Sequence, residues 1–138
     1  MKQIEEQKKA ALEIIESIPL VFLSTIDEEG YPTTRIMMNL RHKEYTYLTP
    51  LYEKEENPMT IYLTTHLSTK KIQEIIANNK SALYFYDHDT YKALLLQGKL
   101  ELVEDKELKR KAWNNKWKEF FPKGVESDEY CLLRFIPV

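Results

Sequence analysis

The fold is decided by the stretch LVFLSTI (20–26), DEEG (27–30) and YPTTRIMM (31–38), read in that order. The first and third segments are rich in β-branched and aromatic residues, which favour strands. The segment between them is short and acidic and ends in Gly30, which is typical of a tight turn. These residues therefore predict an antiparallel β-hairpin.

An amphipathic helix is expected before the hairpin, over residues 2–17. Apolar residues there recur three, four or seven positions apart among lysines and glutamates, and Pro19 ends the pattern. After the hairpin, residues 39–58 contain two prolines and a charged run. We expect them to form mostly exposed loop, with a possible short strand over 45–48.

The rest of the chain predicts further strands and two more helices. Strands are expected over residues 59–65, 81–86, 91–103 and 130–136. The third of these is one long strand or two, with Gly98 marking a bulge or a bend. Helices are expected from Ser68, as the N-cap, to residue 76, and from the cap Asp105 to about residue 120. About six strands and three helices without βαβ alternation favour an antiparallel barrel or sheet flanked by helices.

Length and composition indicate one domain over residues 1–138. The chain is 43% hydrophobic and 12% aromatic, enough for a proper core, which excludes a disordered protein. The net charge of −2 disfavours nucleic acid as a partner. The single cysteine, Cys131, excludes an internal disulfide and a multi-thiolate metal site, so a cytoplasmic protein without a bound metal is expected. Acidic N-terminal residues and short apolar runs predict neither a signal peptide nor a membrane span, so no membrane partner is expected.

The segment YLTTHLSTK (62–70) combines a strand end with a helix start. A helix start offers unpaired backbone N–H groups and the positive end of the helix dipole, and here hydroxyls and a lysine accompany it. The segment therefore predicts a socket for a phosphate group. In the alternative interpretation, Ser68 only caps the helix, while Lys70 and Lys71 lie in solvent.

Arg35 is the one charged residue of the second predicted strand. If the alternation of a strand holds, its side chain lies on the same side as Thr33 and Met37. An arginine is costly to bury alone, so Arg35 needs an anionic partner there. That partner is either a ligand or a glutamate of the protein, and the sequence leaves both open.

No catalytic residue is identified. The three histidines lie in different predicted loops, and the motifs of zinc proteases, serine hydrolases and nucleotide-binding loops do not occur. Cys131 alternates with apolar residues in a predicted strand, as a buried structural thiol does. The basic segment 106–118 places Trp113 and Trp117 four residues apart. This spacing fits either packing of the indoles in the core or contact with an anionic ligand or a membrane surface.

Taken in order, these pieces resemble the pyridoxamine 5'-phosphate oxidase-like superfamily of FMN-binding split barrels, and within it the general stress protein 26 type. The resemblance runs over most of the chain. It rests on the N-terminal helix, FLSTI (22–26) with the turn to Pro32, RIMM (35–38), YLTT (62–65) with STK (68–70), LQGKLELVED (96–105), the helix bearing Trp113, and FPKG (121–124) before the last strand. The resemblance implies a mainly β fold, a six-stranded antiparallel split β-barrel with flanking helices.

The resemblance also implies a homodimer that holds FMN in a cleft at the subunit interface. An arginine of the second strand and the Ser-x-Lys at the helix start would hold the phosphate, which maps to Arg35, Ser68 and Lys70. The backbone of residues 35–38 would run beside the flavin ring, residues 62–65 would line the ribityl chain and phosphate, and a tryptophan would close the pocket. The expected cofactor-binding residues are Arg35, Ile36, Met37, Met38, Tyr62, Leu63, Thr64, Thr65, Ser68, Thr69, Lys70 and Trp113.

The implied activity is that of a flavin-dependent oxidoreductase with a small-molecule electron donor, such as a reduced nicotinamide, or acceptor. The oxidase proper grips pyridoxal phosphate with a tail that bears both arginine and histidine. The segment RFIPV (134–138) lacks that pattern, so oxidation of vitamin B6 is not expected. The alternatives are a non-catalytic sensor or store that binds a flavin or haem, and a deazaflavin-dependent reductase. Apolar side chains such as Met37, Met38 and Tyr84 would form the subunit contact. Residues 39–58 are longer than this type implies, which leaves the shape of the cleft open.

Overall fold

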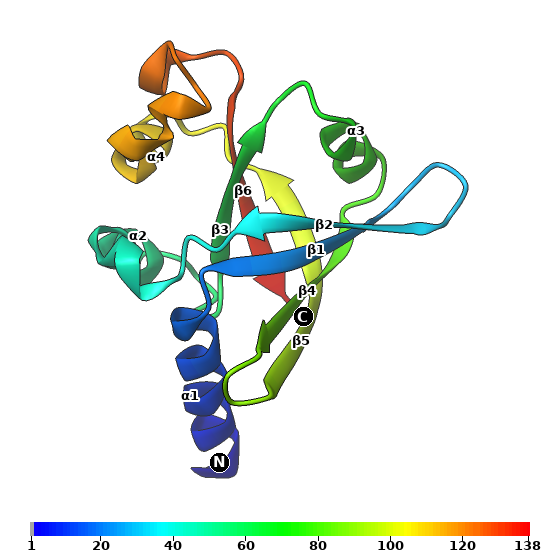
Figure 1. The fold of residues 1–138 in the computed structure, drawn as a ribbon, viewed down its shortest axis with the longest axis vertical. Coiled ribbons are helices and arrows are strands. Elements are labelled where there is room, and N and C mark those ends of the chain that lie inside the picture. Colours follow the sequence, from blue (N-terminus) through cyan, green and yellow to red (C-terminus); the bar gives the residue numbers. More distant parts are fainter. Residues whose placement is uncertain (1) are drawn as a thin grey trace.

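The computed structural model describes residues 2–138, with side chains from Glu5 onward. Six strands form one antiparallel sheet in the order β2-β1-β4-β5-β6-β3 (Figure 1). Their bounds are β1 Leu20–Ile26, β2 Pro32–Met38, β3 Ile61–His66, β4 Lys80–Asp87, β5 Lys92–Leu102 and β6 Tyr130–Pro137. The sheet curls until its edge strands approach each other, and there the Leu40 N–H donates to the carbonyl of Tyr62 at 3.3 Å. The expected fold, a mainly β split barrel with flanking helices, is confirmed.

Within residues 2–138, four α-helices and three short 3-10 helices flank the barrel. They are α1 Lys2–Ser17, α2 Thr49–Glu53, α3 Lys70–Ala77, α4 Lys106–Ala112, η1 Lys43–Leu48, η2 Asn115–Glu119 and η3 Gly124–Glu126. In Figure 1, α1 extends from the lower end of the barrel, α3 lies near the turn between β1 and β2, and α2 and α4 lie on the left. The first helix ends before Pro19, as expected.

The hairpin of β1 and β2 forms as predicted. The carboxylate of Asp27 accepts hydrogen bonds from two backbone N–H groups of the turn. Gly30 adopts a φ of 88°, a left-handed conformation that glycine takes at little cost. The register pairs Leu23 with Arg35. Leu23 is buried in the barrel, and directly paired residues place their side chains on the same face of a sheet. The side chain of Arg35 is therefore also directed toward the inside of the barrel.

Residues 39–58 differ from the expected exposed loop. They contain η1 and α2, so the short strand expected in their middle is a 3-10 helix. Leu48, Leu51 and Tyr52 are buried because their spacing of three and four residues places them on one helical face. Pro50 is tolerated since it lies in the first turn of α2.

The basic helix predicted over 105–120 is interrupted. Asp105 caps it as expected, and its carboxylate accepts from two backbone N–H groups. However, α4 ends at Ala112, and Trp113 leaves the helix with a ψ of 139°. The break lets Trp113 pack edge-on against Tyr130, with ring centroids 5.2 Å apart. Burial of aromatic rings therefore overrides the helical preference of this lysine-rich segment.

Gly98 does not mark a bulge. β5 is one continuous strand and keeps its register with β4 through Gly98. A Cβ atom at this position would collide with the backbone carbonyl of Ile136 and lie 2.8 Å from Cζ of Phe135. The close approach of β6 therefore explains the glycine.

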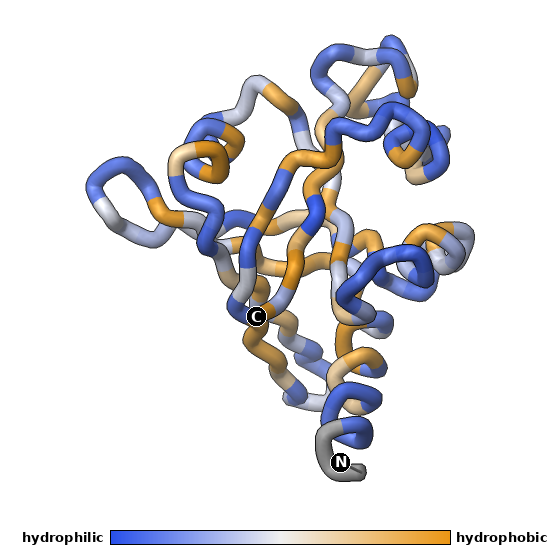
Figure 2. The backbone as a smooth tube through the Cα atoms, turned by 180° about the vertical axis from the view of Figure 1, so that it is seen from behind, coloured by the Kyte–Doolittle hydropathy of each residue, from blue (hydrophilic) through white to orange (hydrophobic). Residues whose placement is uncertain are grey.

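Apolar side chains form two cores, one on each face of β3. The first lies inside the barrel and includes Leu23, Leu63 and Phe135, and the second includes Tyr62 and Trp117 and lies under the helices around α2 and α4. As a result, β3 is buried on both faces. In Figure 2 the strands at the centre are largely hydrophobic, while the outlying loops are hydrophilic. Among the helices described, none combines the length and the apolar composition needed to cross a membrane.

Candidate functional site

Arg35 points into one end of the barrel, on the same side of β2 as Thr33 and Met37. This orientation is the one that strand alternation predicts. Its guanidinium has a partner in the protein, because Nη2 lies 3.1 Å from Oε2 of Glu74 on α3. The sequence leaves open whether the anionic partner of Arg35 is a ligand or a glutamate of the protein. The structure shows a glutamate of the protein.

Glu74 is buried at the centre of a hydrogen-bonded cluster. Its Oε2 atom accepts from Thr25 Oγ1 at 2.6 Å and from Thr33 Oγ1 at 3.0 Å, as well as from Arg35. Only 6% of Glu74 is exposed. Hydrogen bonds, the one from Thr25 above all, hold the pKa of Glu74 below its usual value although burial opposes this. The carboxylate is therefore negatively charged at neutral pH.

Lys71 brings a second positive charge to this cluster. Its Nζ donates to Thr65 Oγ1, at the end of β3, over 2.5 Å. Partial burial first, and the charge of Arg35 second, lower the pKa of Lys71. Among the residues that the structure describes, no carboxylate lies within 4.0 Å of the Lys71 ammonium. Because β2 and β3 are the edges of the sheet, Arg35 and Thr65 lie on opposite sides of the split in the barrel.

Lys71 is not among the residues expected at the site, although helical spacing identifies it. The helix begins one residue later than expected, with Thr69 as the N-cap in place of Ser68 and without a side-chain cap hydrogen bond. Ile75 is buried, and Lys71 lies four residues before it and three before Glu74. That spacing places all three side chains on the face of α3 that covers the barrel.

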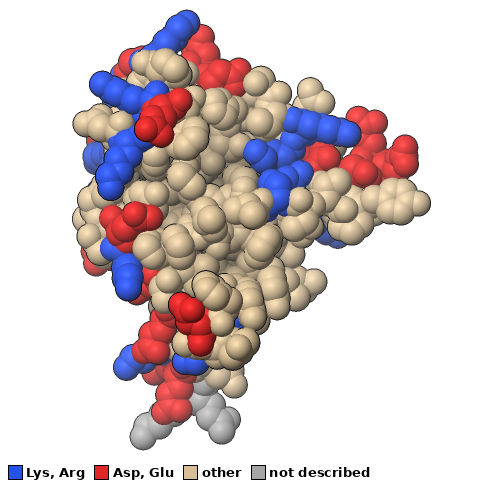
Figure 3. Space-filling model, viewed as in Figure 1, with Lys and Arg blue, Asp and Glu red and all other residues tan. Residues whose placement is uncertain are grey.

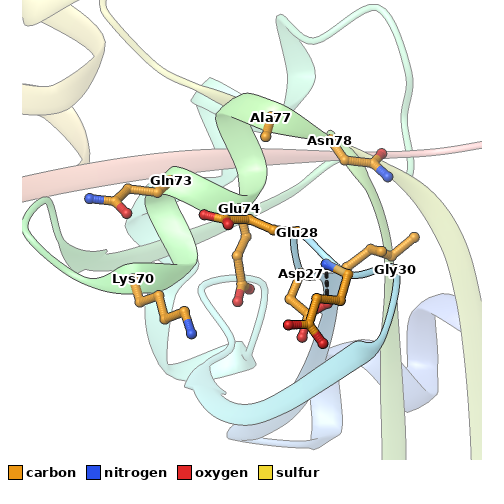
Figure 4. A pocket seen from close by; sticks show the side chains of 10 residues that line it. Asp27, Glu28, Gly30, Lys70, Gln73, Glu74, Ala77 and Asn78 are labelled. Carbon is orange, nitrogen blue, oxygen red and sulfur yellow. Dashed lines mark hydrogen bonds between the residues drawn. The ribbon is translucent and has the colours of Figure 1, made fainter.

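Lys70 faces a different part of the surface. Together with Gln73 and Glu74 it lines a hollow of about 510 Å³ between α3 and the β1–β2 turn. In Figure 4 the opposite wall of this hollow carries Asp27 and Glu28. Lys70 therefore lies near acidic residues of the turn, whereas its neighbour on the helix lies near the arginine. The phosphate contact expected of Lys70 stays a prediction.

Donors at the start of α3 are already engaged within the protein. The Ser68 N–H donates to Oε2 of Glu129 at 3.0 Å, and hydrogen bonds from Ser68 hold the pKa of Glu129 below its usual value. Thr69 Oγ1 donates to the carbonyl of His66 at 2.9 Å. A phosphate bound at Ser68 would therefore have to displace the partly exposed carboxylate of Glu129.

Residues 62–65, expected to line the ribityl chain and phosphate, point alternately to the two cores. Leu63 and Thr65 face the inside of the barrel, while Tyr62 and Thr64 face the second core. The Tyr62 hydroxyl donates there to a glutamate at 2.6 Å. Of the four side chains, Thr65 alone joins the cluster around the arginine.

The remaining predicted residues lie apart from the cluster. Met37 is buried in the barrel core, so its side chain is not available to an outer surface. Met38 packs partly against the second core, and Ile36 is exposed on the outer face of β2. Trp113 packs in the aromatic cluster of the second core. Of the two interpretations of this residue, core packing and contact with a ligand or membrane, the structure thus shows core packing.

The arrangement at the split suits an anion. Arg35 pairs with Glu74, and Lys71, three residues before Glu74 on α3, donates to the hydroxyl of Thr65; the carboxylate of Glu74 offsets part of the positive charge. Donor sets of this kind bind phosphate groups. Cys131 lies near Lys71, but burial raises the pKa of its thiol to about 11, so the thiol is protonated at neutral pH. The geometry therefore provides no activated nucleophile at this cysteine.

Comparison with known proteins supports the resemblance. Residues 7–137 match the model of the family described as pyridoxamine 5'-phosphate oxidase. None of the curated proteins compared with the chain matches it significantly. Among solved structures, a protein from Clostridium acetobutylicum related to general stress protein 26 of Bacillus subtilis is 28% identical. The two structures align with a TM-score of 0.74, and the alignment covers 94% of this chain and 82% of the Clostridium protein.

Two further structures share the fold. General stress protein 26 from Bacillus anthracis is 22% identical, with a TM-score of 0.71. The alignment covers 95% of this chain and 88% of the Bacillus protein. A pyridoxamine 5'-phosphate oxidase-related, FMN-binding protein from Nostoc punctiforme is 16% identical, with a TM-score of 0.62. The alignment covers 96% of this chain and 80% of the Nostoc protein. Because the family model spans nearly the whole sequence, the chain belongs to the pyridoxamine 5'-phosphate oxidase family.

Proposed function

We propose that this protein binds FMN, and that Arg35, Lys71 and the Thr65 hydroxyl hold the phosphate of the cofactor at the split in the barrel. The observation that carries the proposal is the half-buried Lys71 ammonium. It donates to Thr65, lies three residues before the Glu74 that pairs with Arg35, and has no carboxylate within 4.0 Å among the described residues. Partial burial of a charge without an opposite charge is costly, which favours an anionic ligand. The FMN-binding protein from Nostoc punctiforme, which has the same fold, supports this choice of anion.

The proposed assembly is a homodimer with FMN at the subunit interface. Adjacent positions on the outer face of β1, β2, β4 and β5 carry apolar side chains that are each at least 40% exposed: Phe22, Ile36, Tyr84 and Leu95. In Figure 3 charged side chains lie mostly at the margin of the molecule, and its centre is largely uncharged. An exposed apolar face of this kind is typical of a subunit contact. A second copy placed there would also cover a flavin ring beside β2.

The activity supported best is that of an FMN-dependent oxidoreductase with a small-molecule electron donor or acceptor. The bound flavin supplies the redox chemistry, while the residues of the chain bind and orient it. Oxidation of pyridoxamine phosphate is not proposed. Arg134 is held by Glu55 and Glu101, each at 2.7 Å, and is thus engaged within the protein. The free thiol of Cys131 fits the expected cytoplasmic location.

Neighbouring lysines provide a matched test of the phosphate site. Wild-type protein, Lys71→Met and Lys70→Met are titrated with FMN and with riboflavin, and binding is followed by flavin fluorescence. We expect the wild type to prefer FMN by more than about tenfold, since charge-assisted hydrogen bonds to the phosphate are lost with riboflavin. Lys71→Met should lose most of this preference and Lys70→Met should keep it. Equal affinity of the wild type for both flavins would contradict the phosphate site, and loss in Lys70→Met alone would assign the role to Lys70.

Reduction of the bound flavin tests the proposed activity. The FMN complex is mixed with NADH or NADPH without oxygen, and the absorbance of the oxidised flavin is followed over time. Rapid bleaching supports an oxidoreductase with a nicotinamide donor. Stoichiometric FMN that no small donor reduces would favour a non-catalytic sensor or store instead. The visible spectrum of the purified protein distinguishes a flavin from haem.

A further inference from the structure

Glu74 places a fixed negative charge inside the site proposed for the phosphate. Its Oε2 lies 3.1 Å from Nη2 of Arg35 and also accepts hydrogen bonds from the hydroxyls of Thr25 and Thr33. The Glu74 side chain is buried and three donors hold its Oε2, whereas the side chain of Glu129 is much more exposed. A ligand at the arginine therefore binds beside a carboxylate that stays in place.

The charges of the site do not match those of a phosphate dianion. Arg35 and Lys71 contribute two positive charges and Glu74 one negative charge, which leaves one net positive charge. A phosphate monoester carries nearly two negative charges above its second pKa of about 6. Within this cluster of one chain, the second charge of such a ligand therefore meets the carboxylate of Glu74 and no third cation.

We propose that Glu74 is a specificity-determining residue, whose buried carboxylate offsets Arg35 and adapts the site to ligands with a singly charged anionic group. Lys71 then provides most of the electrostatic attraction, while the arginine contributes donors to a ligand without adding net charge. This inference rests on the proposed flavin phosphate site. It identifies the ligand class as flavin esters whose second negative charge adds little to binding.

Replacing Glu74 by Gln tests this role, because the amide keeps the shape of the side chain and still accepts hydrogen bonds from the hydroxyls. Glu107→Gln is the matched control, since Glu107 is exposed on α4 and pairs only with Lys111 among the described residues. At about pH 8, where the phosphate is a dianion, we expect Glu74→Gln to bind FMN about tenfold tighter than the wild type. Riboflavin affinity should be unchanged, and the control should alter neither. Without ligand, Glu74→Gln should melt at a lower temperature, because Arg35 loses its partner.

In Glu74→Gln the affinity for FMN should rise while the melting temperature without ligand falls. These opposite changes distinguish a role in specificity from a structural role. A merely structural residue would lower the stability and both flavin affinities together, and that result would overturn the proposal. An unchanged ratio of FMN to riboflavin affinity in Glu74→Gln would overturn it as well. Equal affinities of the wild type for the two flavins would instead contradict the phosphate site itself.

A second measurement needs no variant and decides the question if Glu74→Gln does not fold. Riboflavin 5'-sulfate has the shape of FMN but carries one negative charge. We expect the wild type to bind the two esters with affinities within about threefold of each other at about pH 8, because the second charge of FMN gains nothing beside Glu74. A preference for FMN of about tenfold or more would overturn the proposal.

Discussion

At the scale of single residues, the ion pair of Arg35 and Glu74 determines how the ligand-free protein responds to mutation. Arg35→Ala leaves a buried carboxylate without its cation. Because the arginine side chain is itself 23% exposed, we expect a loss of about 2 kcal/mol in the free energy of unfolding, measured by urea denaturation without flavin. Arg110→Ala is the control, since Arg110 pairs with Glu126 at 3.4 Å on the surface and should contribute less than about 0.5 kcal/mol. Similar effects of the two variants would show that burial does not strengthen the first pair.

The titration of Glu74 predicts how stability depends on pH. Its pKa in the folded protein lies below the usual value of 4.5, so the unfolded chain takes up a proton at a higher pH than the folded protein does. The stabilisation by Glu74 is therefore complete at neutral pH and is lost as the pH falls below about 4.5 and through the folded pKa. We expect the difference in unfolding free energy between the wild type and Glu74→Gln to be largest near neutral pH and to shrink in acid. Urea denaturation over a range of pH measures it, and a constant difference would contradict the assignment.

Arg35 also illustrates what could be predicted for a residue of the site. Its inward orientation follows from strand alternation, which is a local property. Its partner Glu74 lies 39 residues away, and the pairing depends on how α3 packs over the barrel. The distinction between Lys70 and Lys71 depends on the same packing, because consecutive residues of a helix point about 100° apart. A motif that specifies residue types without the rotation of the helix cannot separate the two lysines.

At the scale of elements, the pairing of β5 with β6 depends on Gly98. Gly98→Ala would drive a methyl group against the carbonyl of Ile136, which cannot move without disturbing the pairing of the strands. We expect a loss of at least about 2 kcal/mol in the free energy of unfolding, measured by urea denaturation. Gly124→Ala is the comparison, because Gly124 has a φ of 78° but no atom within 4 Å of an added Cβ. It should cost about 1 kcal/mol, and a larger effect than that of Gly98→Ala would contradict the steric explanation.

Elements with strong local patterns were predicted correctly, and those shaped by distant packing were not. The hairpin over 20–38 combines β-forming residues with a turn that ends in Gly30, and its prediction is confirmed. The expectation of an exposed loop over residues 39–58 is wrong, because Pro50 and the charged run after it obscure the helical spacing of the buried side chains. The helix expected over 105–120 is too long, because its break at Trp113 follows from the packing of this ring against Tyr130, which the lysine-rich pattern does not indicate.

At the scale of the whole molecule, strand order could not be derived from local patterns. Six strands without crossover helices predicted an antiparallel barrel or sheet, and the family resemblance narrowed this to a split barrel. The edges of the sheet, β2 and β3, are set by pairings between segments far apart in sequence, such as β1 with β4. Because of this order, α3 contacts both edges of the split: Glu74 binds Arg35 of β2 and Lys71 binds Thr65 of β3. The proposed site is therefore a product of the topology and not of one motif.

The apolar outer face of β1, β2, β4 and β5 predicts the behaviour of the assembly. Tyr84 lies opposite Phe22 on one side and Leu95 on the other, within this face. Tyr84→Glu would bury an unpaired carboxylate in the proposed subunit contact, which is costly, so we expect dimers to become monomers in analytical ultracentrifugation. The variant should still fold, because Tyr84 is 42% exposed in the single chain.

The matched control for this prediction is Ile76→Glu, since Ile76 is 71% exposed on α3, outside the apolar face. That variant should sediment as the wild type does and bind FMN equally well. If the second copy covers the flavin ring, Tyr84→Glu should weaken FMN and riboflavin by similar factors, because the lost contact concerns the ring that both ligands share and not the phosphate. A Tyr84→Glu monomer with full affinity for FMN would show that one subunit completes the site. A wild-type protein that sediments as a monomer with its flavin bound would contradict the homodimer itself.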